Sequence, residues 1–155
     1  MFANKKNKEA KKFFARVLVL EPDKAPYEDQ VEVNMDAVCK RLNIPPVCVE
    51  TLWEDDICKP DIDKRFLIIT DSFAKRRHPV RFNRMIWNGL EPLCGTAIIV
   101  RHGEGKALFQ SLSDDEIAEL TDKYANWMTD EEKEAWEGEI IGGLYVLPVP
   151  EGSEQ

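Results

Sequence analysis

The stretch RVLVLEPDKAPYEDQVEVNMDAVCKRLN, residues 16–43, carries two strand signals and a helix signal in succession. Valine and leucine alternate over residues 16–20, which is typical of a β-strand, and Pro22 closes that strand. Residues 30–34 alternate apolar and polar side chains, as a half-buried strand does. We expect the two strands to pair as a hairpin across the turn-rich loop that contains Pro26.

A short amphipathic helix is expected directly after this hairpin, near residues 35–43. Asn34 is a typical N-cap residue, and the proline pair at 45–46 stops the helix. Apolar side chains recur there at spacings of three and four residues: Met35, Val38 and Leu42.

Working outward, four more segments have the composition of strands: residues 47–53, 65–72, 91–102 and 107–112. The second of them, RFLIITDS, is largely apolar and is predicted to be central in the sheet. Gly95 within the third marks a close backbone approach or a bulge.

Two helices are expected towards the C-terminus, near residues 114–127 and 130–137. Each begins with a capping box, a Ser or Thr followed three residues later by Glu: Ser113 with Glu116, and Thr129 with Glu132. Residues 139–150 then have the pattern of a final strand or extended segment. Since strands outnumber helices and the helices fall in two clusters, the sequence predicts an α+β fold with a mainly antiparallel sheet.

Charge is spread unevenly along the chain, whose formal net charge is −8. Residues 1–16 hold six basic groups and one acidic group, and residues 75–84 hold five basic groups and none acidic. Residues 113–155, in contrast, hold thirteen acidic and two basic side chains. An acidic body of this kind opposes nonspecific binding to nucleic acid, because it repels phosphates except where the local charge reverses.

The cysteines and the hydropathy indicate the cellular compartment of the protein. None of the four cysteines lies in a C-x-x-C pair, so neither a zinc ribbon nor a dithiol redox motif is predicted. We interpret them as buried reduced thiols: Cys39, Cys48, Cys58 and Cys94. No apolar run approaches the roughly 18 residues of a membrane helix. We therefore expect a cytoplasmic protein without a membrane segment.

No motif for catalysis, a cofactor or a metal ion emerges. His78 and His102 lie in different segments, and the acidic residues 55–63 lack the ligand spacing of an EF-hand. The turn GEGK at 103–106 lacks the length of a phosphate-binding P-loop. None of the candidate serines lies in a G-x-S-x-G turn: Ser72, Ser111 and Ser113. We expect no enzymatic activity and no cofactor.

The stretch KRRHPVRFNRMIW, residues 75–87, has three interpretations. Its arginines could pair with acidic side chains of the same domain, which leaves a solvated loop. They could also contact a partner protein or a small ligand, since arginine and aromatic side chains are enriched in protein interfaces. Nucleic acid is the third, with the phosphates held by arginines and the bases stacked on Phe73, Phe82 and Trp87. The acidic surroundings favour nucleic acid least.

The order of four motifs resembles the family called domain of unknown function 3846. The motifs are RVLVLEPDKAPYEDQVEVN at 16–34, RFNRMIWN at 81–88, CGTAIIV at 94–100 and FQSLSDDEIAELTDKY at 109–124. That family occurs mainly in phages, plasmids and integrative elements of Firmicutes and related bacteria. Its Asn-Arg dipeptide corresponds to Asn83-Arg84, which the resemblance singles out from their neighbours. The family has no established activity, so no catalytic residue is carried over.

The domain organisation follows from length, composition and this resemblance. The 155 residues fit one α+β domain over residues 15–150. We expect a basic, flexible lead-in at 1–14 and a tail at 151–155. The part similar to the family spans 16–126, and residues 127–150 are a C-terminal extension.

The resemblance implies an accessory protein of a phage or another mobile genetic element. We expect it to bind a host protein or a small ligand, for example to inhibit host defence. The expected binding residues are Arg76, Arg77, Arg81, Asn83, Arg84 and Trp87. The alternative is a nucleic-acid-binding protein that uses the basic segment 75–84 and the lysine-rich N-terminus. The acidic C-terminal helices are a second candidate face.

Overall fold

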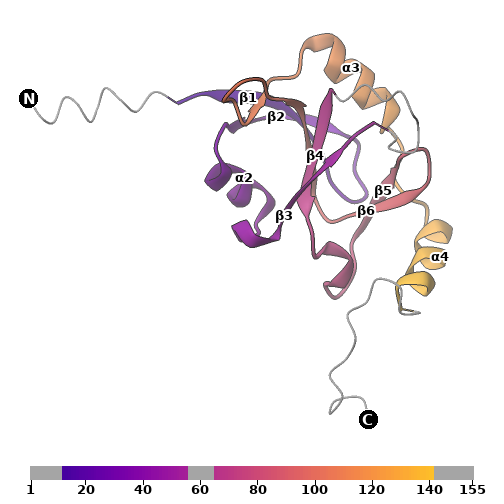
Figure 1. Cartoon of the computed structure of the whole chain (residues 1–155). Helices are drawn as coiled ribbons and strands as arrows, with labels where there is room; N and C mark the ends of the chain where they lie inside the picture. The colour runs from indigo at the N-terminus through magenta and orange to yellow at the C-terminus, as the bar shows by residue number, and fades with distance from the viewer. Residues whose placement is uncertain (1–11, 56–64, 142–155) are drawn as a thin grey trace, which may run out of the picture.

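The computed structural model describes residues 12–55 and 65–141 (Figure 1). Three predicted features therefore lie outside the described residues, wholly or for the most part. They are the basic lead-in, the acidic segment 56–64 with Cys58, and the extended segment and tail after residue 141.

The main β-sheet is antiparallel, with the strand order β2-β1-β7-β4-β3 and the short strand β8 paired with the end of β7. Its strands are β1 (Phe14–Leu20), β2 (Tyr27–Glu32), β3 (Val49–Trp53), β4 (Phe66–Asp71), β7 (Ala97–His102) and β8 (Phe109–Gln110). The predicted α+β fold with a mainly antiparallel sheet is thus confirmed. The centre of the sheet is β7, however, and the predicted central strand, β4, lies beside it.

The predicted hairpin of β1 and β2 is present, with Val17 opposite Asp29 in the register. Side chains of β1 alternate between two buried clusters on opposite faces of the sheet, with Val17 and Val19 in one and Leu18 and Leu20 in the other. Both faces of β1 are therefore covered, which explains why its sequence is apolar without interruption over these four residues.

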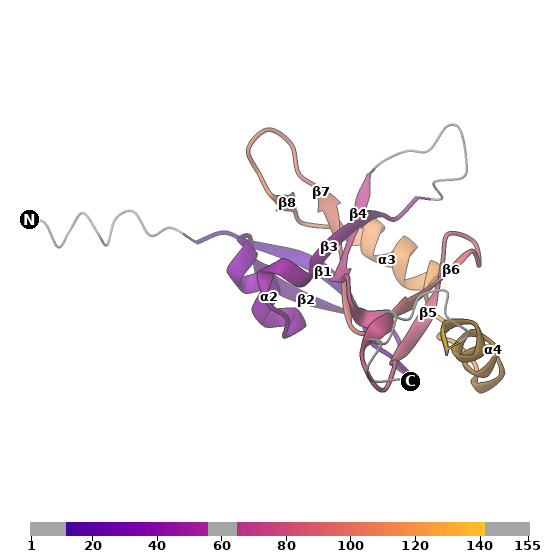
Figure 2. The same ribbon diagram turned by 60° about the horizontal axis from the view of Figure 1, so that its bottom comes forward.

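One face of the sheet is covered by helix α2 (Met35–Leu42), and the other by helix α3 (Asp114–Lys123) (Figure 2). Asn34 caps α2 as predicted, because its side chain accepts a hydrogen bond of 2.8 Å from the backbone amide of Ala37. Both predicted capping boxes are also formed, at the starts of α3 and of helix α4 (Asp130–Ile141).

The limits of the helices differ from the predicted ones. Helix α3 ends at Lys123 instead of residue 127, since the backbone carbonyl of Tyr124 accepts a hydrogen bond from Arg84 and the chain turns away. Helix α4 runs to Ile141, beyond residue 137, and so includes the first residues of the predicted final strand. Val47 is not in a strand, because residues Pro46–Cys48 form the 3₁₀-helix η1.

Residues 91–102 were predicted to be a single strand, and this prediction is wrong. The segment divides at Gly95 into β6 (Glu91–Cys94) and β7, which belong to different sheets. Gly95 has a φ of +73°, a left-handed conformation that disfavours other residues. Strand β6 instead pairs with β5 (Phe82–Ile86), so the second half of the basic stretch is a strand as well.

The β5–β6 hairpin packs on the same face of the main sheet as α3. Ile86 and Leu93 from the hairpin join Leu120 of α3 in one buried cluster. On its other side, the hairpin packs against the C-terminal part of the described chain, where Phe82 and Cys94 contact a cluster that includes Met128 and Ile140. The hairpin is therefore a layer between the main sheet and α4 (Figure 2).

Candidate functional site

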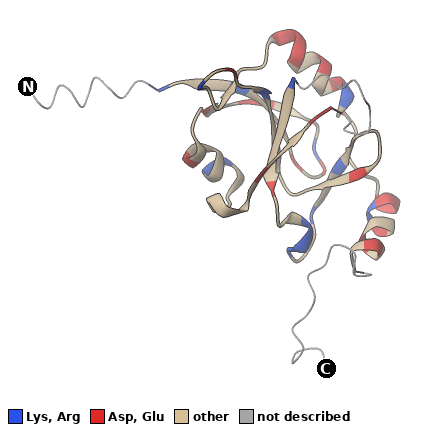
Figure 3. Cartoon of the chain, viewed as in Figure 1, with Lys and Arg blue, Asp and Glu red and all other residues tan. Residues whose placement is uncertain are grey.

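The basic residues of the predicted site lie around the connection between β4 and β5. We call residues 74–81 the arginine loop; it begins with the short 3₁₀-helix η2 (Ala74–Arg76). Ala74 is buried and Val80 packs beside it, so the loop is anchored at both ends. The loop projects from the sheet at the end opposite the acidic helix α3, whereas α4 lies on the same side as the loop (Figure 3).

Two of its basic side chains form ion pairs within the chain. Lys75 pairs with Glu91 of β6, and Arg77 pairs with Asp71 at the end of β4. Arg77 also donates a hydrogen bond of 3.1 Å from Nη2 to the second oxygen of Asp71, so the contact between guanidinium and carboxylate is bidentate. The predicted pairing within the domain is therefore present for these two residues.

The two other arginines of the loop are exposed. The guanidinium of Arg76 lies 5.9 Å from the ring centroid of Phe73, within cation–π range. Arg81 has no side-chain hydrogen bond or ion pair within residues 12–55 and 65–141, although its backbone carbonyl accepts a hydrogen bond from the Gly95 amide at 2.7 Å. The sequence stretch with five basic residues thus presents a smaller charged surface than its composition suggests.

Arg84 was predicted to face a partner, and this prediction is wrong. Its side chain is 1% exposed. The guanidinium donates to the backbone carbonyls of Glu21 at 3.0 Å and Lys24 at 2.5 Å, and also to that of Tyr124. No carboxylate compensates the charge among the contacts of Arg84, and burial accordingly lowers its pKa below the ordinary value. Arg84 joins three distant segments of the fold.

Asn83 is also buried, at 0% exposure, and cannot contact a partner. Its amide nitrogen donates to the carbonyl of Leu20 at 2.9 Å and to that of Gly95 at 2.7 Å. The Asn83 side chain therefore ties the end of β1 to the turn between β6 and β7. The prediction that Asn83 binds a partner is therefore wrong, and its role is structural.

Trp87 is half-buried and packs against the cluster beneath α3. Its indole nitrogen donates a hydrogen bond of 2.8 Å to the carbonyl of Trp53, at the end of β3. Of the six predicted binding residues, Arg76, Arg77 and Arg81 thus remain on one exposed loop. Asn83, Arg84 and Trp87 hold the β5–β6 hairpin in place.

A cavity of about 260 Å³ lies between the arginine loop and the C-terminal end of α2. We call it the arginine cavity, because Arg41, Arg77 and Arg81 line it. Sequence reasoning did not connect Arg41 with the loop, since the two are far apart in the chain. The rest of the lining combines one carboxylate with polar and apolar groups: Asp71, Asn43, Thr96, Leu42, Ile44, Ala74, Pro79 and Gly95.

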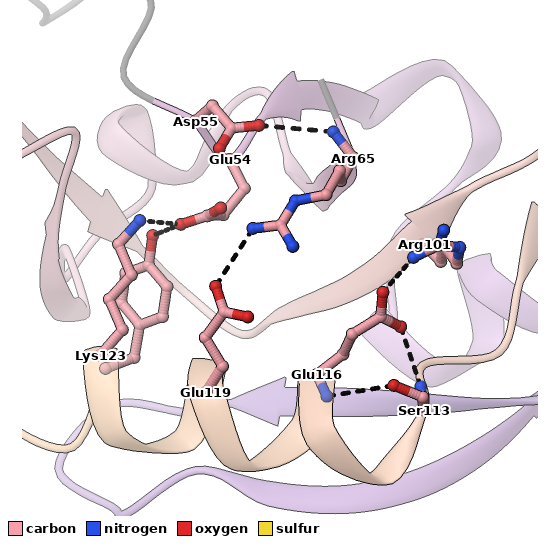
Figure 4. Close-up of polar contacts among 9 residues, drawn as sticks. Glu54, Asp55, Arg65, Arg101, Ser113, Glu116, Glu119 and Lys123 are labelled. Atoms are coloured by element: carbon pink, nitrogen blue, oxygen red, sulfur yellow. Dashed lines mark hydrogen bonds and ion pairs between the residues drawn. The ribbon is translucent and has the colours of Figure 1, made fainter. Parts of the chain in front are cut away.

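A second polar cluster joins the end of β3 to α3 (Figure 4). Glu54 is 2% exposed, accepts a hydrogen bond of 2.5 Å from the hydroxyl of Tyr124 and pairs with Lys123. Burial, together with the adjacent Glu54 charge, raises the pKa of Tyr124 above its ordinary value. Nothing in the sequence distinguishes Glu54 from its acidic neighbours.

The remaining side chains of this cluster also connect the sheet with α3 (Figure 4). Arg65 donates to Glu119 at 3.1 Å, and Arg101 pairs with Glu116, the residue that completes the capping box. Burial and the charge of Glu54 raise the pKa of Asp55 above its ordinary value. These contacts between oppositely charged groups position α3, and we assign the cluster a structural role.

Ser111, Ser113 and three cysteines are engaged in structural contacts or buried, whereas the candidate Ser72 is exposed. The Ser113 hydroxyl caps α3, and that of Ser111 accepts a hydrogen bond of 2.9 Å from the Arg16 amide. Cys39, Cys48 and Cys94 are free thiols and buried. Burial raises the pKa of Cys94 to about 11, which disfavours the reactive thiolate.

Comparisons of the chain with protein-family models, curated proteins and solved structures find no match. The resemblance to the family of unknown function therefore stays a prediction. Within the described part of the chain, no helix is long and apolar enough to span a membrane. The same residues contain no group of three or more His, Cys, Asp or Glu side chains that could hold a metal ion.

Proposed function

We propose that this chain is a non-enzymatic binding protein that contacts an acidic surface of a partner protein through Arg76, Arg77 and Arg81. The observation that carries the proposal is the position of Arg81. It is exposed on an anchored loop and has no ion-pair partner among the described residues, in a protein whose net charge is −8. An arginine that is left uncompensated in acidic surroundings is suited to a carboxylate supplied by another molecule.

Further support comes from the way the loop is held. The ion pair between Arg77 and Asp71 and the burial of Ala74 fix the loop before any partner arrives. Binding then requires less ordering of the chain, which lowers the entropic cost of association. Cys94 is buried and the hydroxyls of Ser111 and Ser113 are engaged, and the exposed Ser72 has no hydrogen bond to a histidine among the described residues, which together favour a binding role over nucleophilic catalysis.

The biological setting of the proposal rests on the family resemblance. A member of that family would be an accessory protein of a phage or mobile element, acting in the bacterial cytoplasm on a host protein. Inhibition of a host defence system is one activity of that kind. The charge pattern is compatible with this setting because the loop can meet an acidic protein while the rest of the acidic surface repels nucleic acid.

The test is a nuclease-treated affinity pull-down from bacterial host lysate. It compares the natural protein with an Arg76→Gln/Arg81→Gln variant and with a Lys12→Gln/Lys106→Gln variant, which loses the same charge at exposed positions outside the loop. We expect a stoichiometric protein that is retained by the lysine variant and lost from the arginine variant. Equal recovery with all three proteins would contradict the proposed binding face. Nucleic acid recovered without nuclease, in place of a protein, would favour the alternative function.

A further inference from the structure

We infer that the arginine cavity binds a small molecule that carries a phosphate group. This site goes beyond the proposed protein contact and rests on it only in part, since Arg77 and Arg81 belong to both surfaces. Arg41 lines the cavity but lies on α2, outside the loop, while Arg76 belongs to the loop but does not line the cavity. These two residues allow the two functions to be tested separately.

The charge and the donors of the lining favour an anion with several oxygen acceptors. Three guanidinium groups and one carboxylate line the cavity, and Asp29, which pairs with Arg41 at 2.9 Å, leaves a local charge of +1. A phosphate monoester carries between one and two negative charges near neutral pH, and a carboxylate carries one. Both anions therefore suit the local charge, and a phosphate group is favoured because it offers three acceptor oxygens to the guanidinium donors.

The arginines that line the cavity have guanidinium nitrogens without a hydrogen bond among the described residues. Arg41 uses Nε on Asp29 at 2.9 Å and Nη2 on the Tyr27 hydroxyl at 2.8 Å. Arg77 uses Nε and Nη2 on Asp71. The Nη1 group of each has no hydrogen bond within residues 12–55 and 65–141. In the same residues no side-chain nitrogen of Arg81 has a hydrogen bond. Planar guanidinium groups match phosphate oxygens in geometry, which makes arginine the preferred residue for such anions.

The two paired arginines are also held in place before a ligand binds. Asp71 fixes Arg77, and Asp29 with Tyr27 fixes Arg41, so neither side chain has to lose its full rotamer freedom on binding. Arg81 is the third group, exposed and without a side-chain partner among the described residues, and it would bind the anion directly. A site with two fixed cations and one free cation combines low ordering cost with access from solvent.

The size and the apolar part of the lining indicate a small ligand. A volume of about 260 Å³ is slightly below the range of roughly 300–1,000 Å³ that is typical of ligand pockets. Leu42, Ile44 and Pro79 offer apolar contacts for the organic part of a phosphate ester. A cavity of this volume has no room for a nucleic-acid strand.

The experiment is an NMR titration of the full chain with inorganic phosphate at constant ionic strength, followed through the backbone amides of Gly95 and Thr96, which line the cavity. Parallel titrations use acetate and a short single-stranded oligonucleotide. We expect phosphate to shift both amide signals and to bind at least about tenfold more tightly than acetate, because it engages several charged donors. Binding of acetate with equal affinity, or stronger shifts with the oligonucleotide, would overturn the assignment to a phosphate-bearing small molecule.

The variants identify the donors. Arg81→Gln should weaken phosphate binding by about tenfold or more, since a hydrogen bond to a charged group is lost from an exposed residue that supports no other part of the fold. Arg41→Met should also weaken phosphate binding by about tenfold or more. The dispersion of its amide signals shows that the variant is folded. The matched control Arg76→Gln should change the affinity by less than about twofold, because its charge is outside the cavity and screened.

The outcomes separate the two proposals. No shift at Gly95 and Thr96 with phosphate, or equal effects of Arg76→Gln and Arg81→Gln, would overturn the cavity assignment and leave the pull-down result unaffected. Loss of the partner protein from Arg76→Gln with unchanged phosphate binding would support both proposals as distinct functions. Phosphate binding that persists without any partner in the pull-down would support the cavity and overturn the protein contact.

Discussion

The Nε atom of Arg84 donates a hydrogen bond of 2.8 Å to Oδ1 of Asn83, its neighbour in the sequence, and both side chains are buried. Together they bind backbone carbonyls at the end of β1, in the loop after β1, at the turn before β7 and at the end of α3. The Asn-Arg dipeptide therefore fixes how the β5–β6 hairpin sits on the main sheet. Since the arginine loop leads into this hairpin, the dipeptide supports the binding surface without being part of it.

Replacing Arg84 should cost much of the stability of the protein. Arg84→Met keeps an apolar stem of similar length but leaves the carbonyls of Glu21, Lys24 and Tyr124 without a donor. We expect the free energy of unfolding to fall by about 3–5 kcal/mol, because each buried acceptor left unsatisfied carries a penalty. Urea unfolding followed by circular dichroism measures the change. Arg81→Met, at an exposed arginine without a partner among the described residues, should stay within about 0.5 kcal/mol, and a similar loss for both variants would refute the structural role of Arg84.

Replacing Asn83 by aspartate should destabilise the protein although it would place a carboxylate beside Arg84. The amide nitrogen of Asn83 donates to the Leu20 and Gly95 carbonyls, and an ionised carboxylate cannot donate. We expect Asn83→Asp to lower the free energy of unfolding by about 2–4 kcal/mol, measured by urea unfolding. Asn83→Asp with equal or greater stability would show that the ion pair with Arg84 outweighs both lost hydrogen bonds.

The left-handed turn at Gly95 should make that position sensitive to a single methyl group. A Cβ atom there would lie 3.6 Å from the Cβ of Ala74, an ordinary contact, so the cost of Gly95→Ala comes from its φ of +73°. We expect a loss of about 1–2 kcal/mol in thermal or urea unfolding. Gly138→Ala in α4 is the matched control, because nothing lies within 4 Å of its added Cβ. That variant should gain about 0.5–1 kcal/mol, and equal effects at the two glycines would contradict the backbone explanation.

Alkaline pH should destabilise the protein through Tyr124. Burial and the hydrogen bond to Glu54 raise the pKa of Tyr124 in the folded state, so the folded protein retains a proton that the unfolded chain loses near pH 10. The contribution of this proton is fully present below pH 10 and decreases as the pH rises above it. We expect the free energy of unfolding to decline above about pH 10, and the decline to be smaller in Tyr124→Phe. Parallel curves for the two proteins would exclude Tyr124 as the source.

The thiol of Cys94 should resist alkylation in the native protein. Burial raises its pKa to about 11, so roughly one molecule in a thousand carries the thiolate at pH 8, and the sulfur is also inaccessible. Peptide mass spectrometry after iodoacetamide treatment should find Cys94 unmodified in the native protein and modified in urea. Rapid labelling under native conditions would mean that the hairpin opens away from the Met128 cluster.

Several local features of this fold follow from short stretches of the sequence. The alternation in residues 16–20, the cap at Asn34 and the capping boxes at Ser113 and Thr129 each depend on residues within one or two turns, and the structure contains all of them. Neighbouring residues dictate such features because the relevant hydrogen bonds close over three or four positions. The same local reasoning failed at Gly95, where an apolar run that looks like one strand is divided between two sheets.

Which basic side chains face outward was decided by the tertiary structure alone. Arg81 and Arg84 are three positions apart in the same basic stretch, yet the first is exposed and the second is 1% exposed. A guanidinium can be buried only where enough acceptors converge on it, and here they come from Glu21, Lys24 and Tyr124, at least 40 residues away in the chain. Arg41 reaches the arginine cavity for the same reason, since α2 packs near the loop. The sequence by itself determined the elements and their caps, and long-range packing determined which arginines support the fold and which are available for binding.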